Sequence, residues 1–525
     1  MSTISSPESV MKRRDFLFLF LAALAVALTV AALQPVPGYM DAAYYYAGGT
    51  QLAAGNGFQE QFIWNYLDHP GSLPHPSHAY WYPLASIIAA GGMALAGTVN
   101  FSAARIGFVL MAALAPLAVT ALAWRITRRR PLALLTGVLA IFSGYYLPFI
   151  VTTDNYSLYL LLGALYFLLL ENLTLPKAAL LGLLAGLLNL ARGDGLLWLP
   201  LTLLAVAALT FRDSSAPACA RILPAVSRAL VSFAGYLLVM GSWMLRNLSV
   251  FGSLLPPGSS SVLWMTSYNQ LYSYTPEMYT FQSWLATGWK AIFAARLDAL
   301  FQNLSTAFFA QGMIFLAPLA AVGLWGNRKV FRVQVAVLGW LTLLLAESFL
   351  FPFASVSGGF FHAGATFQPL WFVLAAAGLE RLVQRRTPQV ATVARISLVL
   401  VAILFSGMLV KMRVLDTGWN EGEYLYQQAD QLLVEQGAAS EEIVMTRNPP
   451  AYFIMTGRRA IVVPYGDVET LLAAARQFDA RYVLLETDGI SGELADLFAH
   501  PEAYPDFGYV GKVDDALLLS ILPSR

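Results

Sequence analysis

Asp41 is an acid that directly follows the first apolar stretch of the chain. It opens the segment 40–46, behind the apolar run 16–33 and the turn residues 35–38. A carboxylate held at the outer surface of a membrane, followed by a long polar loop, suits chemistry on a lipid-linked substrate. The simpler alternative is a helix N-cap, because an aspartate side chain accepts hydrogen bonds from the first backbone N–H groups of a helix.

Arg192 and Asp194 form a second charged motif, with a glycine after each of them. The motif lies between two short apolar runs, 178–191 and 196–211. Charges near a membrane are costly and are functional candidates for that reason. The guanidinium of Arg192 offers a planar fork of donors that suits a lipid phosphate, and Asp194 is a candidate substrate contact. The alternative is an ion pair that closes a helical hairpin.

Four further residues at expected outer ends of apolar runs could contact a substrate. Arg246 needs an anionic partner, which could be a substrate phosphate, a lipid headgroup or the C-terminal dipole of its own helix. Asp154, in a very short loop, could hold the acceptor or a metal ion, or could cap the next helix. His362 lies in a glycine-rich segment and is a candidate phosphate contact. Tyr44 is a candidate substrate contact close to Asp41.

Three histidines in the first predicted outer loop raise the question of a metal site. They are His69, His75 and His78, and Asp68 precedes them. Their spacing is irregular, the loop is rich in proline, and no pair has the four-residue helical spacing. We therefore assign no metal site and no firm cofactor, and retain these four residues as the candidate ligands if a divalent metal is used.

The composition indicates a polytopic membrane protein. Of the 525 residues, 58% are hydrophobic and 12% are charged, whereas soluble domains carry about 25% charged residues. The net charge of +1 argues against a nucleic-acid partner. The single cysteine, Cys219, excludes an intrachain disulfide framework. No phosphate loop, dinucleotide fingerprint or serine-nucleophile elbow is present, so an activated donor would have to reach the outer face on a lipid.

The apolar runs predict about eleven transmembrane helices. The run at 83–99 is short and rich in glycine, and we interpret it as a juxtamembrane or re-entrant helix. The predicted spans are 16–34, 105–124, 132–150, 156–171, 178–191, 196–211, 226–245, 303–324, 333–351, 367–379 and 393–410.

The distribution of basic residues predicts the orientation. With 83–99 outside the count, most Lys and Arg before residue 411 fall in loops on the side of the N-terminus, and only five fall on the other side. Cytoplasmic loops are enriched in Lys and Arg, so the N-terminus is predicted to be cytoplasmic, behind an uncleaved first span. The five on the outer side are Arg105, Arg192, Arg246, Lys290 and Arg296.

The predicted outer regions are a first loop at 35–104, a loop at 247–300 and the segment after residue 411. The last of these changes character. The runs 443–446, 460–463 and 482–485 predict short buried strands, and 467–478 predicts an amphipathic helix that starts at Asp467. We therefore expect a transmembrane domain at 1–411 and a small extracytoplasmic α/β domain at 412–525, in a mainly α fold.

In order and sidedness, these features resemble the GT-C class of polytopic glycosyltransferases, in particular the protein O-mannosyltransferase and lipid A aminoarabinose transferase group. The resemblance covers nearly the whole chain. It departs from the family at Ala42, where many relatives carry a second acid, and at Pro76-Ser77-His78, where they often have two prolines. The matching features are Asp41, Gly48-Gly49, Gly55-Asn56-Gly57, the helix from Pro76 to Pro83 leading to Arg105, Thr153-Asp154, the segment 192–195, Arg246 with Phe251-Gly252, and Phe361-His362 before Pro369.

The resemblance implies a hexosyl- or pentosyltransferase that uses a polyprenyl-phosphate sugar donor and inverts the anomeric carbon. Asp41 would be the general base on an acceptor hydroxyl. Arg192, with Arg246 or His362, would stabilise the leaving phosphate. The acceptor could be a lipid, a protein or a polysaccharide. The competing hypotheses are a transporter or flippase of lipid-linked sugars, which usually places ionisable groups at the bilayer midplane, and a non-catalytic envelope assembly protein of the same fold.

Overall fold

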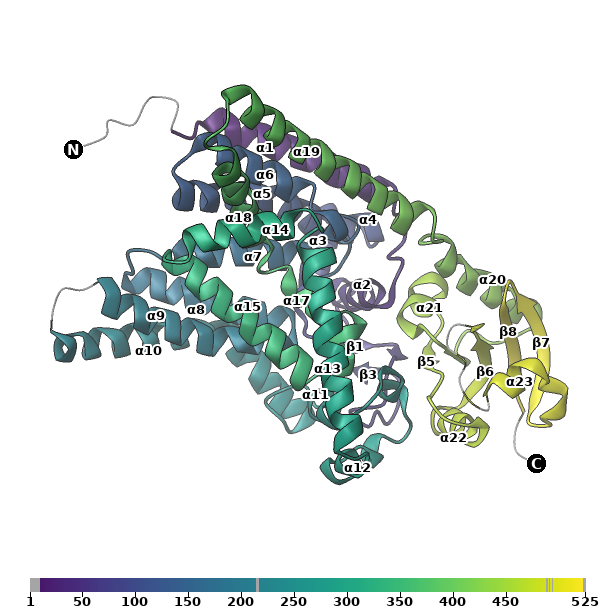
Figure 1. Ribbon diagram of the computed structural model, residues 1–525. Helices are drawn as coiled ribbons and strands as arrows, with labels where there is room; N and C mark the ends of the chain where they lie inside the picture. Colours follow the sequence, from purple (N-terminus) through teal and green to yellow (C-terminus); the bar gives the residue numbers. More distant parts are fainter. Residues whose placement is uncertain (1–9, 214–216, 488–489, 491, 493, 523–525) are drawn as a thin grey trace, which may run out of the picture. The chain divides into compact units, whose positions relative to one another are not determined.

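The chain folds into two compact units, each assembled from three segments of the sequence (Figure 1). The computed structural model describes residues 10–213, 217–487, 490, 492 and 494–522, without the side chains of residues 213, 259 and 260. Unit 1 comprises Met1–Leu33, Arg105–Ser249 and Arg296–Leu415. Unit 2 comprises Gln34–Ala104, Val250–Ala295 and Asp416–Arg525.

Unit 1 is helical in the residues that the structure describes. Its apolar sequence favours helices, because an α-helix satisfies its own backbone hydrogen bonds without water. The helices that contribute to it are α1 (Arg13–Ala32), α5 (Ile106–Thr127), α6 (Arg130–Ile141), α7 (Tyr156–Leu169), α8 (Leu175–Ala191), α9 (Trp198–Asp213), α10 (Ala218–Phe251), α13 (Trp289–Thr306), α14 (Leu316–Asn327), α15 (Phe331–Phe349), α16 (Pro352–Ala354), α17 (Phe360–Gly364), α18 (Gln368–Val383) and α19 (Pro388–Val410).

Six helical stretches among the described residues are long and apolar enough to cross a membrane. Two bent helix pairs raise the number to eight if each pair is one span. These helices make the chain a multi-pass membrane protein. The six are Arg13–Ala32, Phe101–Thr127, Gly193–Arg212, Ala218–Phe251, Phe331–Phe349 and Pro388–Leu415.

The structure does not confirm the number of eleven spans, which stays a prediction. Several of the predicted segments form helices that are shorter than a span or are broken. The run 132–150 gives only α6, which ends at Ile141 before Gly144 turns the chain with a φ of 62°. The run 303–324 is not one straight helix. It bends by 94° between α13 and α14, where Met313 and Ile314 have positive φ angles.

Helices α14 and α18 pack closely because two glycines let their backbones meet. A methyl group on Gly323 would overlap the carbonyl oxygen of Leu374, and one on Gly378 would overlap that of Leu319. Small residues at a crossing permit this approach between transmembrane helices. The contact places α18, and with it the preceding helix α17, firmly within unit 1.

Ion pairs join loops that the sequence assigns to the cytoplasmic side. Arg130 makes two hydrogen bonds to Asp15, of 2.8 and 2.6 Å. Glu171 lies 2.9 Å from Arg125 and 2.5 Å from Arg332, and Arg129 lies 2.7 Å from Glu380. The acids and bases come from five separate loops or helix ends of unit 1. These loops therefore share one face, as the charge distribution predicts, while the orientation of that face stays a prediction.

Unit 2 contains a six-stranded sheet in the order β2-β5-β4-β6-β8-β7. Strands β2, β5, β4 and β6 are parallel, and β8 and β7 continue the sheet in antiparallel fashion. Strand β2 comes from the first loop, which also holds the short pair β1 and β3. The strands are β1 (Gln59–Glu60), β2 (Phe62–Ile63), β3 (His75–Pro76), β4 (Ile443–Thr446), β5 (Ala460–Val462), β6 (Ala480–Leu485), β7 (Phe507–Val513) and β8 (Ala516–Ile521).

Helices cover this sheet and join the first loop to the C-terminal segment. Ala43, on the first helix of the unit, shares a buried apolar core with Tyr426, Leu433 and Tyr452. The helices are α2 (Met40–Ala53), α3 (Leu84–Ala96), α4 (Phe101–Ala104), α11 (Gly258–Ser261), α12 (Phe281–Ala286), α20 (Glu421–Glu435), α21 (Pro449–Thr456), α22 (Val468–Phe478) and α23 (Leu494–Ala499).

The C-terminal elements lie where the sequence predicts them. The three predicted strands correspond to β4, β5 and β6, and the predicted amphipathic helix is α22, with Asp467 as its N-cap. The division at residues 411 and 412 stays a prediction. The observed sheet also takes in β2, and the shared core also takes in α2, so unit 2 is larger than the C-terminal segment.

Candidate functional site

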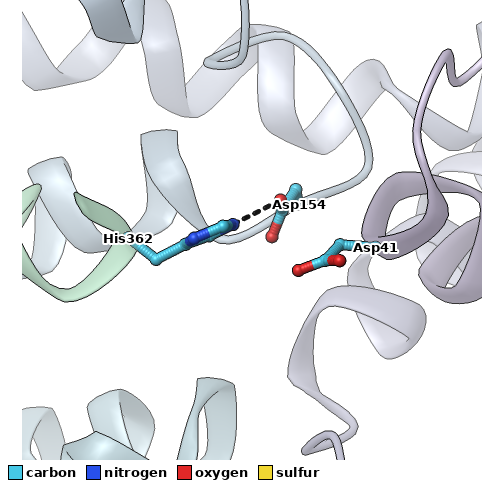
Figure 2. A group of neighbouring side chains, drawn as sticks. All are labelled: Asp41, Asp154 and His362. Carbon is cyan, nitrogen blue, oxygen red and sulfur yellow. Dashed lines mark hydrogen bonds and ion pairs between the residues drawn. The ribbon is translucent and has the colours of Figure 1, made fainter. Parts of the chain in front are cut away.

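A buried pair of Asp154 and His362 forms the centre of the candidate site in unit 1. The Nε2 atom of His362 lies 3.1 Å from Oδ2 of Asp154, and Figure 2 shows the imidazole pointing at the carboxylate. Asp154 is fully buried in the loop before α7, and the side chain of His362, on α17, is 12% exposed. Asp41, the third residue labelled in Figure 2, belongs to unit 2.

The contacts of His362 show that a proton or a cation must lie between its Nε2 atom and the carboxylate of Asp154. Its Nδ1 atom lies 2.9 Å from the carbonyl oxygen of Gly358, which can only accept a hydrogen bond, so Nδ1 carries a proton. Nε2 faces a carboxylate, which also accepts. A second proton or a cation is therefore needed between Nε2 and Asp154. An imidazole oriented by a backbone carbonyl is the usual arrangement of a histidine metal ligand.

The surroundings of Asp154 favour its charged form. Burial by itself raises the pKa of Asp154, but the imidazole of His362, the N–H of Asn155 and the guanidinium of Arg192 together hold that pKa below its ordinary value. The N–H of Asn155 donates to Oδ1 over 2.6 Å. The predicted N-cap role is wrong for Asp154: α7 starts at Tyr156, and its N-cap is Asn155.

Arg192 and Asp194 make an ion pair at the turn between α8 and α9. The Nε atom of Arg192 donates to Oδ2 of Asp194 over 2.8 Å, and the hydroxyl of Tyr159 donates to Oδ1 over 2.9 Å. Arg192 ends α8 in an extended conformation, and a short 3-10 helix, η3 (Gly193–Leu197), follows. Gly195 is required there, because a methyl group would overlap the carbonyl oxygen of Leu188. The pair thus closes the hairpin and presents a guanidinium near Asp154.

Glu347 is a further buried acid of this region, on α15. Its side chain lies against the turn that carries His362, so that a methyl group on Gly359 would stand 3.0 Å from its Oε2 atom. The adjacent Gly358 has a φ of 121°, a conformation that side chains rarely adopt. Glu347 therefore supports the turn that orients the imidazole.

Arg246 lies on α10, which continues to Phe251 rather than ending at this arginine. Its guanidinium stacks over Trp243, 4.7 Å from the ring centroid, and donates to Asn247 over 3.1 Å. These contacts orient the side chain while leaving it half-buried. Its role as a phosphate ligand stays a prediction.

Asp41 lies in the first turn of α2 in unit 2, and it is half-buried. The predicted N-cap role is wrong here too. The helix begins at Met40, and its N-cap is Tyr39, whose extended backbone marks the boundary. A carboxylate in the first turn of a helix is stabilised by the helix dipole without capping it. Capping of α2 therefore does not account for an acid at this position, and its role as a catalytic base stays a prediction.

Tyr44 lies in the interior of unit 2 and is 2% exposed. Its hydroxyl donates to Glu60 over 3.0 Å and accepts from the N–H of His78 over 2.8 Å. Its ring packs edge-on against Trp81, with the centroids 4.7 Å apart. These contacts give Tyr44 a structural role on the same helix as Asp41. Its role in substrate binding stays a prediction.

The four candidate metal ligands of the first loop have different partners. His75 pairs with Asp68 at 2.6 Å, whereas His69 lies 3.2 Å from Glu277 in the loop 247–300. The Nδ1 atom of His78 lies 3.2 Å from the backbone oxygen of Trp81. The loop thus divides these ligands among separate contacts.

Two tyrosines near the site were not predicted. Tyr156 stacks on the imidazole of His362, with the centroids 4.3 Å apart and the planes at 25°, and Tyr159 holds Asp194. Their three-residue spacing places both on one face of α7, directly after Asp154. This spacing after Asp154 is the sequence signal that could have identified the two tyrosines.

Comparisons with solved structures identify the fold. ArnT, the lipid A aminoarabinose transferase from Cupriavidus metallidurans, bound to undecaprenyl phosphate, matches 98% of this chain and 100% of its own length, with 13% identity and a TM-score of 0.59. The oligosaccharyltransferase of Archaeoglobus fulgidus, in complex with zinc and sulfate, matches 94% of this chain and 71% of its own, with 14% identity and a TM-score of 0.56.

Sequence comparison adds no closer relationship. No protein-family model matches the chain, and no curated protein matches it in sequence. The similarity is thus one of fold, and it extends over nearly the whole chain. This protein shares the fold of GT-C glycosyltransferases, as the resemblance in its sequence predicts.

Proposed function

We propose that this chain is an integral membrane glycosyltransferase that moves a sugar from a polyprenyl-phosphate donor to an acceptor hydroxyl on the extracytoplasmic face. The observation that carries the proposal is the buried pair of Asp154 and His362 beside the ion pair of Arg192 and Asp194, in a chain with the GT-C fold. Charged groups are concentrated here at the ends of apolar helices, where a lipid headgroup would arrive.

The cationic groups of unit 1 serve the leaving phosphate. When the bond between C1 of the sugar and the phosphate oxygen breaks, negative charge grows on the phosphate. Donors placed in advance where charge develops lower the barrier. Arg192 is held by Asp194, His362 by Gly358 and Asp154, and Arg246 by Trp243 and Asn247. These contacts already restrict the three side chains, so that each loses little conformational freedom when the phosphate binds.

Asp41 serves as the general base in this scheme. Its carboxylate takes the proton of the acceptor hydroxyl while the oxygen attacks C1 from the face opposite the phosphate, so the anomeric configuration inverts. Polyprenyl phosphate leaves as an anion and needs no proton from an acid. The predicted topology supports the assignment, because it places Asp41 and the segments that carry Asp154, Arg192 and His362 on the same side of the membrane.

A divalent metal ion is compatible with the donor set. Asp154 offers a carboxylate oxygen and His362 offers Nε2, which its bond to Gly358 leaves directed at Asp154. Carboxylate and imidazole are common ligands of zinc and manganese. A bound ion would supply positive charge to the leaving phosphate. His362 would be oriented by Gly358, and Arg192 would still neutralise Asp194.

Transfer in reconstituted membranes tests the proposal. The purified chain in liposomes receives undecaprenyl-phosphate-linked mannose, glucose or arabinose labelled in the sugar, together with an oligosaccharide as acceptor. Cleavage of the bond to phosphate, by transfer to the acceptor or to water, is measured. Asp41→Asn should abolish cleavage, whereas Asp506→Asn, an exposed acid on the same unit, should leave it unchanged. Movement of intact labelled lipid between leaflets without cleavage would instead identify a flippase.

A further inference from the structure

A cavity of about 120 Å³ opens in unit 2 at the carboxyl ends of the parallel strands. Arg447 follows β4, Tyr465 comes shortly after β5, and Glu486 follows β6. The chain leaves β4 towards β5 and leaves β6 towards β7, which lies at the opposite edge of the sheet. In open α/β sheets, ligands bind at the carboxyl ends of strands where neighbouring connections diverge in this way.

The loop 247–300 completes the wall of the cavity. A 3-10 helix, η5 (Tyr268–Tyr272), contributes Tyr268, Asn269 and Tyr272. The N–H of Tyr465 donates to the carbonyl oxygen of Tyr272 over 3.0 Å, and Ser273 pairs with Tyr465 in a parallel bridge. The loop is therefore joined to the end of β5, and the cavity is formed before any ligand arrives.

The chemical character of the cavity suits a carbohydrate. Tyr268 and Tyr465 are 38% and 39% exposed, so their rings can accept the apolar CH face of a sugar. Asn269 and Arg447 are exposed beside them, and their planar groups offer fixed hydrogen-bond donors to hydroxyls. Ligand pockets are usually lined by apolar and aromatic side chains with a small number of convergent polar groups, as this cavity is.

Glu486 distinguishes this cavity from an anion site. Its carboxylate accepts from the hydroxyl of Thr446 over 2.8 Å and from the N–H of Arg447 over 3.0 Å. The hydroxyl of Tyr426 also donates to it, over 3.0 Å. A carboxyl group held beside the only lining arginine among the described residues repels a phosphate or sulfate, while it can accept from a sugar hydroxyl.

The cavity lies within electrostatic reach of Asp41 in the same unit. Burial contributes most to the raised pKa of Tyr268 and of Tyr272, and the charge of Asp41 raises both pKa values further. The charge of Asp41, a residue of the same unit, thus reaches the hydroxyls of both tyrosines.

We propose that this cavity is the acceptor subsite and that the acceptor is a carbohydrate, one of whose sugar rings stacks on Tyr268 and Tyr465. The inference rests on the proposed function, because it names the acceptor class for the base Asp41. Arg447 and Asn269 bind the hydroxyls of that ring, and Glu486 accepts from one of them. A hydroxyl of the bound acceptor is the group that Asp41 deprotonates.

Direct binding tests the subsite without any donor. Saturation-transfer NMR on the full chain in nanodiscs, with maltotriose, cellotriose and mannotriose as probes, should show binding of at least one trisaccharide. Tyr268→Ala, Tyr465→Ala and Arg447→Ala should each weaken it about two- to tenfold. The matched variants Tyr509→Ala and Arg481→Ala change exposed residues of β7 and β6 and should leave it unchanged. The cavity residues and the control residues are all exposed, so each substitution should leave the fold intact.

Three results would overturn the subsite. They are binding of none of the trisaccharides, equal binding by the cavity variants, and binding only of a serine- and threonine-rich peptide. Asp41→Asn separates this test from that of the proposed function. It should abolish cleavage of the donor while trisaccharide binding persists. If donor cleavage survives in Asp41→Asn but trisaccharides bind in the cavity, the base is wrong and the subsite stands.

Discussion

The imidazole of His362 lies 3.1 Å from the carboxylate of Asp154, although 208 positions separate the two residues in the sequence. Each sits where helical structure is interrupted. Asp154 precedes α7 in a tight loop, and His362 follows the glycines at 358 and 359. The pair therefore joins two breaks in the helical bundle. Removing one partner of a buried ion pair destabilises the fold, because the other charge then stays buried without compensation.

Replacing Asp154 by asparagine should lower the rate of donor cleavage by about 10²–10³-fold, because the imidazole of His362 would lose its buried carboxylate partner. Asparagine is nearly the same size, so packing is preserved. The measurement is cleavage of undecaprenyl-phosphate-linked sugar in liposomes. The control is Asp298→Asn, an exposed aspartate on α13. An unchanged rate in Asp154→Asn would remove the pair from the mechanism.

Sequence reasoning could find the residues of this pair but not their contact. Asp154 and His362 were singled out because charged or titratable groups at the ends of apolar runs are rare. Nothing in the local pattern specifies which two helix breaks meet, since that depends on how glycines let helices such as α14 and α18 approach. The N-cap roles considered for Asp41 and Asp154 are wrong by two positions and by one, because the N-caps of those helices are Tyr39 and Asn155.

Gly195→Ala should destabilise the hairpin between α8 and α9 and reduce donor cleavage. A methyl group at this position overlaps the carbonyl oxygen of Leu188, and overpacking of this kind costs about 1–3 kcal/mol. The displaced turn would move Asp194 and its partner Arg192. Thermal unfolding in detergent and the cleavage assay both report the effect.

Gly241→Ala is the matched control for this substitution. Gly241 lies inside α10, and a methyl group there meets nothing within 4 Å. Alanine favours a helix by about 1 kcal/mol over glycine, so this variant should be as stable as the parent or more so. Equal losses in both variants would show that the hairpin turn has no special role.

Stability should fall with rising pH because of Glu423 on α20. This side chain is 3% exposed, and burial raises its pKa to about 8, although the N–H of Gly38 donates to it over 2.8 Å. The folded state thus binds a proton that the unfolded chain releases near pH 4.3. The stabilisation is complete below about pH 4.3 and is lost as the pH rises through 8.

Glu423→Gln removes this pH dependence, because an amide keeps the acceptor for Gly38 and carries no charge. The unfolding midpoint of the parent should drop by a few degrees relative to the variant between pH 5 and pH 8. Glu421→Gln, an exposed position on the same helix, should follow the parent. A parallel pH profile for the parent and Glu423→Gln would show that Glu423 is ionised in the folded state.

The sequence predicts the C-terminal strands better than the way in which they are combined with the rest of unit 2. Apolar runs bounded by turns mark β4, β5 and β6 because they are buried on both faces. The addition of β2, only two residues long, leaves no such pattern. The same holds for the cavity tyrosines, since Tyr272 meets Tyr465 through backbone atoms that carry no sequence signal.

The single cysteine gives a direct test of orientation. Cys219 is exposed at the start of α10, on a loop predicted to be cytoplasmic. In intact spheroplasts, a membrane-impermeant maleimide should not label it until the membrane is permeabilised. A chain with Cys219→Ser and Lys512→Cys, which moves the thiol to an exposed position of β7, should be labelled without permeabilisation. The reverse pattern would put Asp41 on the cytoplasmic side, where a lipid-linked donor is not required, and would refute the proposed topology.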